Sequence, residues 1–297
     1  MSSPFRWAAP LPDFATPDCA GAIAAVRLAA SQGLQAAEVL WNRLHDFEDD
    51  QLDRIAAAAD EAGLAVEALH LPFGVPLESP RLSLRRSAID QCIRAMHQAA
   101  RFGARVQVFH MTNRAAETPA ATRTLACESI EALLPVAEQL DQVIAVENML
   151  PHHPFAARPG ELVEVVRQFD HPRVRVVFDS GHAHVAGWVT ELLDELAPWI
   201  VHWHLHDNDG TRDLHLQCGY GTTRWDEVFG RVAAVPLDRA VYVEAQPWGG
   251  ATYDVMLREL DALANTCLGR DASPRLASDA QGRWLRDPRT GRLIVEG

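Results

Sequence analysis

The chain has 297 residues, of which 48% are hydrophobic and 7% aromatic, and its formal net charge at pH 7 is −13. This charge disfavours a nucleic-acid partner, because contacts with phosphate backbones depend mainly on lysine and arginine. No apolar run approaches the ~20 residues of a membrane span, and the first ten residues lack the apolar core of a secretion signal. We therefore expect a cytoplasmic protein with no membrane partner.

Short β-branched runs alternate with amphipathic helical runs along the chain, which is typical of repeated βα units and a parallel sheet. The predicted strands lie at 5–9, 36–41, 64–71, 105–110, 143–147, 174–178, 200–206 and 239–244. The predicted helices lie at 17–32, 50–62, 82–102, 118–140, 159–169, 190–199, 225–234 and 253–268. Thr16 and Thr190 are the expected N-caps of the first and sixth helices. Eight strands alternating with eight helices predict a closed (β/α)8 TIM barrel.

The residues after the last helix do not belong to this alternation. We expect one barrel domain over residues 1–269 and a C-terminal extension over residues 270–297. Within the extension, residues 283–296 predict a β-hairpin around a turn at Asp287, Pro288 and Gly291. The hairpin has no chemical signature of its own, and a contact in a homo-oligomer is one possible use for it.

The types of residue that are missing limit the chemistry. All 27 basic residues are arginine, which excludes a lysine Schiff base, a lysine general base and a P-loop. A metal ion then becomes the natural electrophile for carbonyl chemistry. The five cysteines are scattered and form no C-x-x-C pair, which argues against a disulfide framework and a thiolate zinc site.

The segment 202–215, H-W-H-L-H-D-N-D-G-T-R-D-L-H, has the highest density of histidines in the chain. Its first three histidines alternate, so in a strand their side chains share one face. Three imidazoles on one face are costly to bury unless that face points at a cation. We expect His204 to be the metal ligand, with His202 and His206 in supporting positions. Asp213 and His215 add a carboxylate and an imidazole after the turn.

Ionisable residues also fall at or just beyond the carboxyl ends of the third to eighth predicted strands. They are His70, His110, Glu147, Asp179, His204 and Glu244. In an α/β barrel these strand ends form the mouth where active sites are built. The three carboxylates follow apolar strands, where an unpartnered charge is costly to desolvate, and a shared cation would resolve all three. Gly181 is expected to allow a sharp turn that brings His182 to the same mouth.

The residue types favour one kind of chemistry. Glu147, Asp179, His204 and Glu244 suit a borderline divalent metal such as Mn²⁺, Mg²⁺, Co²⁺ or Zn²⁺. Such a metal would hold the two oxygens of a hydroxycarbonyl and acidify the adjacent C–H. Two glutamates could then remove and return a proton through a metal-bound enediolate, giving isomerisation or epimerisation.

Two further residues lie in predicted mouth loops. Trp248 would cover a sugar ring or simply pack against neighbouring loops. Arg212 would meet a phosphate or carboxylate, or remain solvated.

At these positions the sequence resembles the xylose isomerase-like barrel superfamily, which includes sugar isomerases and epimerases and the endonuclease IV family. The motifs are H-L-P-F at 70–73, F-H at 109–110, V-E-N at 146–148, F-D-S-G-H-A at 178–183, H-L-H-D-N at 204–208, D-L-H at 213–215, G-Y-G at 219–221 before Trp225, and V-E at 243–244. The ketose 3-epimerase pattern implies that Glu147, Asp179, His204 and Glu244 bind the metal. It also implies that the two glutamates act as acid and base. We expect His70, His110 and His182 to contact a small sugar-like substrate.

The endonuclease IV pattern implies a different function, cleavage of phosphodiesters at abasic sites by a trinuclear zinc site. Its nine ligands match His70, His110, Glu147, Asp179, His182, His204, Asp213, His215 and Glu244. In that alternative His182, Asp213 and His215 are additional metal ligands. The segment after His70 lacks the tyrosine with which endonuclease IV enters the duplex, and the E-N-M and D-S-G-H-A-H segments resemble the isomerase group.

We therefore hypothesise a divalent-metal-dependent isomerase or epimerase of a sugar, sugar phosphate or polyol. A barrel that binds a sugar without turnover and a dehydratase with the same enolate chemistry are further alternatives.

Overall fold

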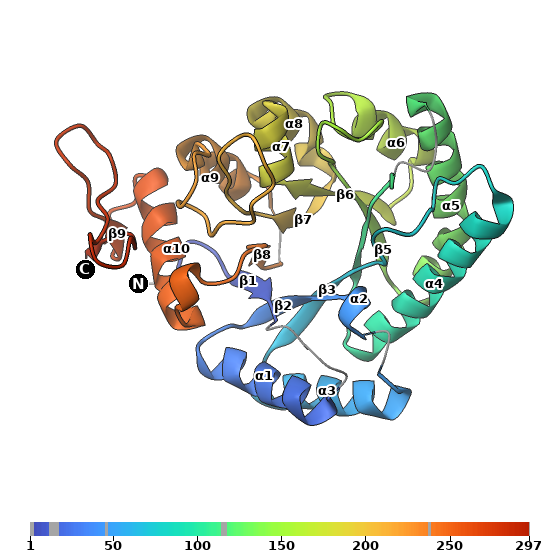
Figure 1. Cartoon of the computed structure of the whole chain (residues 1–297), viewed down its shortest axis with the longest axis horizontal. Helices are drawn as coiled ribbons and strands as arrows, with labels where there is room; N and C mark the ends of the chain where they lie inside the picture. Colours follow the sequence, from blue (N-terminus) through green and yellow to red (C-terminus); the bar gives the residue numbers. More distant parts are fainter. Residues whose placement is uncertain (1–2, 12–17, 45–46, 114–117, 237–238, 297) are drawn as a thin grey trace.

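The computed structural model of the chain describes residues 3–11, 18–44, 47–113, 118–236 and 239–296. Eight parallel strands form one sheet in the order β7-β6-β5-β4-β3-β2-β1-β8. The strands are β1 (Trp7–Pro10), β2 (Ala36–Leu40), β3 (Ala65–His70), β4 (Val106–Phe109), β5 (Val143–Glu147), β6 (Val174–Asp179), β7 (Ile200–His204) and β8 (Val241–Tyr242). A parallel bridge between Leu205 and Val243 joins β7 to β8 and closes the sheet. The predicted TIM barrel is confirmed (Figure 1).

The long helices surround the ring of strands on its outside (Figure 1), and short helical segments follow some of the strand ends. They are α1 (Cys19–Ser31), α2 (Trp41–Leu44), α3 (Asp49–Ala62), α4 (Leu82–Arg101), α5 (Pro119–Gln139), α6 (Glu161–Phe169), α7 (Ser180–Ala186), α8 (Val189–Leu196), α9 (Trp225–Ala234) and α10 (Tyr253–Cys267), with 3-10 turns η1 (Ala197–Trp199) and η2 (Trp248–Gly250). Each long helix buries one apolar stripe, as Leu52 and Ile55 of α3 illustrate. Among the described helices, none combines the length and the apolar character that crossing a membrane requires.

Two predicted helix starts differ from the structure. The expected cap Thr16 lies outside the described residues, and the cap of α1 is Asp18, whose carboxylate accepts hydrogen bonds from the backbone N–H groups of Ala20 and Gly21. Thr190 was expected to cap the sixth predicted helix, but α8 begins one residue earlier, after Trp188. The prediction for Thr190 is therefore wrong, because its backbone is already helical and cannot adopt the extended cap conformation.

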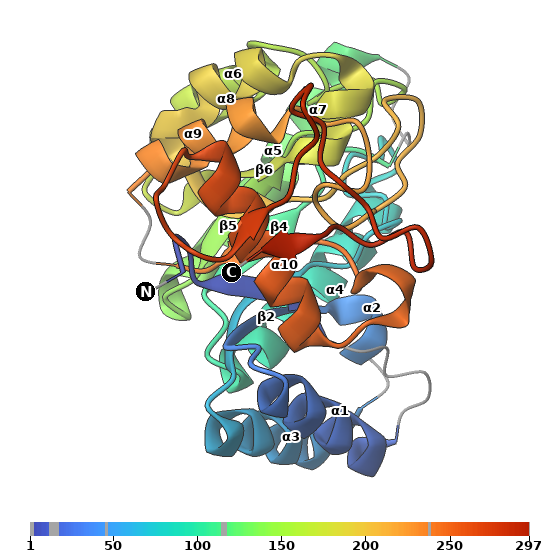
Figure 2. The same ribbon diagram turned by 90° about the vertical axis from the view of Figure 1, so that its left-hand side faces the viewer.

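The C-terminal extension contains the predicted turn and a strand pair at a different place. The turn is closed by a 2.8 Å hydrogen bond from Gly291 N to Asp287 O, and Arg286 and Leu293 form an antiparallel bridge beside it. The regular pair, however, joins β9 (Arg275–Leu276) to β10 (Val295–Glu296). Both strands lie against α10, outside the barrel (Figure 2).

Candidate metal centre and active-site cavity

The barrel brings six ionisable residues together at the carboxyl ends of its strands. Four of them are the last residues of β3, β5, β6 and β7, one follows β4 and one lies just beyond β8. In that order they are His70, Glu147, Asp179, His204, His110 and Glu244. A cavity of about 670 Å³ opens at this mouth, and four of the six line it: His70, His110, Glu147 and Glu244. The other two, Asp179 and His204, are fully buried.

Four of these residues form a compact donor set. One possible ligand atom from each of Glu147, Asp179, His204 and Glu244 lies within 4.8 Å of the others. His204 Nδ1 lies 3.0 Å from Glu147 Oε1, 3.1 Å from Glu244 Oε2 and 4.0 Å from Asp179 Oδ2. Nδ1 is therefore the imidazole nitrogen that faces the carboxylates. Three carboxylates around one imidazole nitrogen are a donor set that fits a borderline divalent cation, and the cation would offset their mutual repulsion.

A second group extends this set on the side of β3 and β4. His110 Nε2 lies 2.9 Å from Glu147 Oε2 and 3.2 Å from His70 Nε2. His70 Nδ1 lies 2.9 Å from the carbonyl oxygen of Leu71, an acceptor, so Nδ1 carries the hydrogen in neutral His70. His70 Nε2 is then an acceptor, and the hydrogen on His110 Nε2 is shared between His70 and Glu147. His110 thereby positions one oxygen of Glu147.

A third group lies on the side of the loop after β7. His215 Nε2 lies 3.1 Å from Asp213 Oδ2, and His182 Nε2 lies 3.5 Å from the same oxygen. The ring of His206 stacks on that of His215 at 4.2 Å, and its Nε2 lies 3.1 Å from Asp179 Oδ2. His206 therefore links this group to the central set, a direct role that the sequence does not indicate.

Gly181 has a different role from the one expected. It lies inside α7, which follows β6 directly, so no sharp turn separates Asp179 from His182. Asp179 caps this helix by accepting a hydrogen bond from His182 N at 2.6 Å. A Cβ at Gly181 would lie 1.8 Å from Cε1 of His206. The glycine is therefore required by the close approach of an imidazole and not by backbone conformation.

The charges of the site shift the pKa values of its groups in opposite directions. Burial acts to raise the pKa of Glu147, but the neighbouring imidazoles outweigh burial and hold it well below its usual range. Burial acts to lower the pKa of His204, yet the surrounding carboxylates raise it well above its usual value. In the same way the pKa of His182 is raised to about 10 against the effect of burial. The same carboxylates that favour an imidazolium here would also favour a divalent cation.

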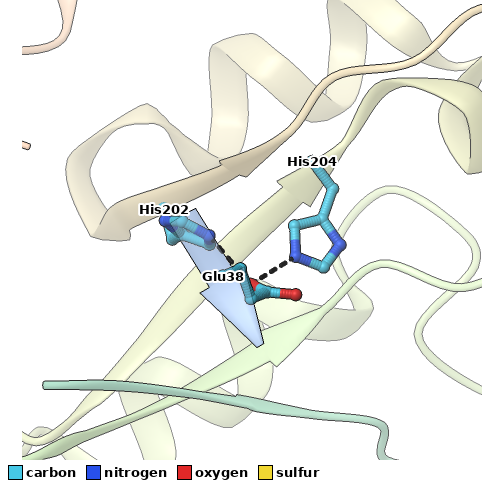
Figure 3. A group of neighbouring side chains, drawn as sticks. All are labelled: Glu38, His202 and His204. Carbon is cyan, nitrogen blue, oxygen red and sulfur yellow. Dashed lines mark hydrogen bonds and ion pairs between the residues drawn. The ribbon is translucent and has the colours of Figure 1, made fainter. Parts of the chain in front are cut away.

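Glu38 is a site residue that the sequence analysis did not single out. It lies in the middle of β2, is 1% exposed and lines the cavity. Its Oε2 lies 3.0 Å from His202 Nε2 and 3.1 Å from His204 Nε2 (Figure 3). Burial acts to raise its pKa, but these imidazoles lower it to about 2. The available signal was one charge within the otherwise apolar segment A-A-E-V-L.

Part of the cavity lining is apolar. Phe73, Leu40 and Trp248 belong to it, and Trp248 stacks on Tyr220 with ring centroids 4.8 Å apart. Arg212 is not brought to this lining, because its side chain is 73% exposed and lies 3.6 Å from Asp209. Among the described residues that line the cavity there is no arginine.

Residues 26–261 match the protein-family model described as xylose isomerase-like TIM barrel. The chain belongs to this family. The match includes every ionisable residue of the candidate metal centre and of the cavity described above. The whole C-terminal extension, residues 270–297, lies beyond it.

Solved structures of xylose isomerase-like barrels and related proteins share the fold. A D-tagatose 3-epimerase-like protein superposes with a TM-score of 0.69 at 22% identity, over 78% of this chain and 88% of that chain. The 3-keto-D-glucoside 4-epimerase YcjR from E. coli superposes with a TM-score of 0.72 at 16% identity, over 87% and 98%. The probable 3-DHS dehydratase AsbF from Bacillus anthracis superposes with a TM-score of 0.62 at 16% identity, over 81% of this chain and 92% of that chain. At these identities the likeness shows the fold.

A curated relative covers a shorter stretch. The uncharacterised protein MJ1311 of Methanocaldococcus jannaschii is 30% identical over 120 residues, which are 39% of this chain and 41% of the relative. The match therefore spans about two fifths of that relative's length.

Proposed function

We propose that the chain is a divalent-metal-dependent isomerase or epimerase of a small sugar or polyol. The observation that carries the proposal is the position of Glu147 and Glu244, whose carboxylates lie 3.0 and 3.1 Å from the same nitrogen of His204 at the edge of the cavity. Glu147, Asp179, His204 and Glu244 would hold the cation. When bound, the cation supplies polarisation of the substrate carbonyl and so acidifies the adjacent C–H.

The two glutamates are the proposed proton-transfer groups. Both line the cavity, where the side chain of Glu244 is 16% exposed and that of Glu147 is 1% exposed. One carboxylate would remove the proton next to the carbonyl, and the other would return a proton. His110 orients Glu147 through the 2.9 Å contact with its Oε2. His182 and His70 also line the cavity and are the proposed hydrogen-bonding partners of substrate hydroxyl groups.

The cavity favours a neutral substrate over a phosphorylated one. Its volume of about 670 Å³ is that of a small-molecule site. Trp248 and Phe73 offer apolar surface to the C–H face of a sugar. Four carboxylates and no arginine are among the described lining residues, so a phosphate group would find no guanidinium partner.

Exchange of substrate C–H hydrogens with solvent deuterium tests this function. Metal-loaded protein is incubated in D₂O with a panel of ketoses, aldoses and inososes, and exchange is followed by ¹H NMR. We expect exchange at the carbon next to the carbonyl of at least one sugar. Glu147→Gln and Glu244→Gln should each slow it by about 10²- to 10⁴-fold, with metal content measured in the same samples. No exchange across the panel by metal-loaded protein would contradict the proposal.

A second candidate function is favoured by the two flanking groups. His70 and His110 adjoin Glu147, while His182 and His215 adjoin Asp213, so further possible cation positions lie beside the central set. Such an arrangement suits multinuclear phosphodiester cleavage. Elemental analysis of protein purified without added metal distinguishes the candidates. About three zinc ions per chain, with incision of abasic DNA, would favour the phosphodiesterase, and one divalent ion per chain would favour the isomerase.

A further inference from the structure

Glu38 and its two histidine partners come from strands that are not neighbours. In the closed sheet, β1 and β8 separate β2 from β7. Glu38 nevertheless reaches His202 and His204 across the barrel interior, and Figure 3 shows one carboxylate oxygen between the two imidazoles. The two histidines are two residues apart on β7, so their side chains point to the same face of the strand. All three side chains are at most 2% exposed.

The geometry of His204 assigns different tasks to its two nitrogens. Nδ1 faces the carboxylates of Glu147 and Glu244, whereas Nε2 lies 3.1 Å from Glu38 Oε2. A neutral imidazole that offers Nδ1 to a cation carries its hydrogen on Nε2. That hydrogen is buried and needs an acceptor, and the Glu38 carboxylate is in place to accept it. Glu38 therefore selects the tautomer of His204 in which the metal-facing nitrogen has a free lone pair.

His202 is placed to hold Glu38 in turn. Its Nε2 lies 3.0 Å from the same oxygen, and its ring stacks on Tyr242 with centroids 5.5 Å apart and planes at 27°. The other oxygen of Glu38, Oε1, has no hydrogen-bond partner among the described residues. The two imidazoles are thus the groups that hold this carboxylate, and its orientation depends on them.

We propose that Glu38 is a positioning residue that fixes the orientation and tautomer of His204 and thereby strengthens metal binding. The inference rests on the proposed function in one respect, the assignment of His204 as a metal ligand. Outer carboxylates bonded to a metal-binding histidine typically change metal affinity by about 10- to 100-fold. Glu38→Gln removes the charge, keeps the shape and places an amide, a weaker acceptor, against His204.

Metal affinity measured by competition with a chromophoric chelator tests the proposal without a substrate. We expect Glu38→Gln to raise the dissociation constant for Co²⁺ and Zn²⁺ by about 10- to 100-fold. The visible spectrum of the Co²⁺ form should shift as well, because the imidazole ligand reorients. Glu259→Gln is the matched control. It alters another buried carboxylate, bonded to Gln217 and Tyr220, that does not contact His204, and it should leave both readouts unchanged.

The wild-type protein provides a second measurement that does not depend on the folding of a variant. Long-range ¹⁵N NMR of histidine-labelled protein, with His204→Gln for assignment, reports which nitrogen carries the hydrogen. In the Zn²⁺-loaded protein, where His204 binds as a neutral imidazole, we expect hydrogen on Nε2 of His204 and none on Nδ1. Hydrogen on Nδ1, or equal metal affinity of Glu38→Gln and wild type, would overturn the proposal.

Two other outcomes have distinct meanings. Loss of one full equivalent of metal in Glu38→Gln, with the remaining affinity unchanged, would also overturn the positioning role, because Glu38 would then be a ligand itself. Failure of the wild-type protein to bind any divalent metal would instead contradict the proposed function.

Discussion

The residues around the candidate metal centre leave no room for an added side chain at Gly181. His206 is fully buried, its Nε2 lies 3.1 Å from Asp179, and its ring stacks on His215. A methyl group at position 181 would collide with this held ring and not with a mobile surface group. The requirement for glycine is therefore a consequence of ring packing between α7 and the segment after β7.

Gly181→Ala should destabilise the fold by about 1–3 kcal/mol or more, which is the usual cost of overpacking a core. Gly230→Ala is the control, because Gly230 also lies inside a helix and a Cβ there meets nothing within 4 Å. It should stabilise the protein by roughly 0.5–1 kcal/mol. Urea denaturation of the two variants measures the difference, and equal midpoints would contradict the packing argument.

The buried cysteines lead to a prediction about thiol reactivity. Burial disfavours the thiolate and raises the pKa of Cys92 to about 12 and that of Cys127 to about 11. At pH 8, below both values, each remains a thiol, and the thiolate fraction grows only as the pH approaches them. Mass spectrometry should show negligible alkylation of both by iodoacetamide in native protein at pH 8, and full alkylation in urea. Rapid native labelling of Cys92 would contradict this expectation.

At the scale of elements, the loop between β7 and α9 is organised by one buried carboxylate. Asp207 Oδ1 accepts hydrogen bonds from the backbone N–H groups of Asn208 and Thr223, and Oδ2 accepts from Gly219 N and Trp225 Nε1. Three of these four donors are backbone N–H groups of the loop, so the fully buried carboxylate holds the loop at three separate points. The same loop carries Asp213 and His215, so Asp207 sets the position of the third group of the site.

Asp207→Asn should cost about 3 kcal/mol, because its amide NH₂ faces two of these donors and leaves them without an acceptor. Asp209→Asn is the control in the same loop, since its side chain is 41% exposed and a surface change of this kind alters stability by about 0.5 kcal/mol or less. Thermal unfolding with a matched denaturant series measures both. A similar loss for the two variants would show that Asp207 does not organise the loop.

At the scale of the whole molecule, the C-terminal extension contacts the structure behind the cavity wall. Arg286 lies over the ring of Tyr220 at 4.7 Å and donates a hydrogen bond to Gly219 O. Arg292 pairs with Glu259 of α10 at 2.7 Å, and Glu259 also accepts a hydrogen bond from Tyr220. Because Tyr220 stacks on Trp248, the extension supports a residue that lines the cavity.

Arg292→Ala should destabilise the protein by about 2 kcal/mol, because it leaves the buried charge of Glu259 without its cation while the arginine itself was partly solvated. Arg283→Ala removes an exposed partner of Asp279 in the same extension and should cost less than about 0.5 kcal/mol. Equilibrium unfolding of both variants checks the difference. Equal stabilities would mean that the extension contributes little through this contact.

The sequence by itself determined the architecture and which ionisable residues meet at the mouth of the barrel. Helical and strand periodicities are local properties, so the eight βα units could be located from the chain, with errors at boundaries, at caps such as Thr190, and in the short helices α2 and α7, which were not predicted. The carboxyl ends of parallel strands must meet at one mouth. Residues such as Glu147 and His204, which end their strands, could therefore be placed together before any contact between them was known.

Only the tertiary structure decided how those residues are held. Glu38 and His204 are 166 positions apart on strands that are not neighbours, and no local pattern relates them. No local pattern predicts the close approach of His206 to Gly181 or the exposure of the Arg212 side chain either. These features depend on closure of the barrel and on side-chain directions across its interior. Sequence periodicity defines the face of a strand but not the partner that the face meets.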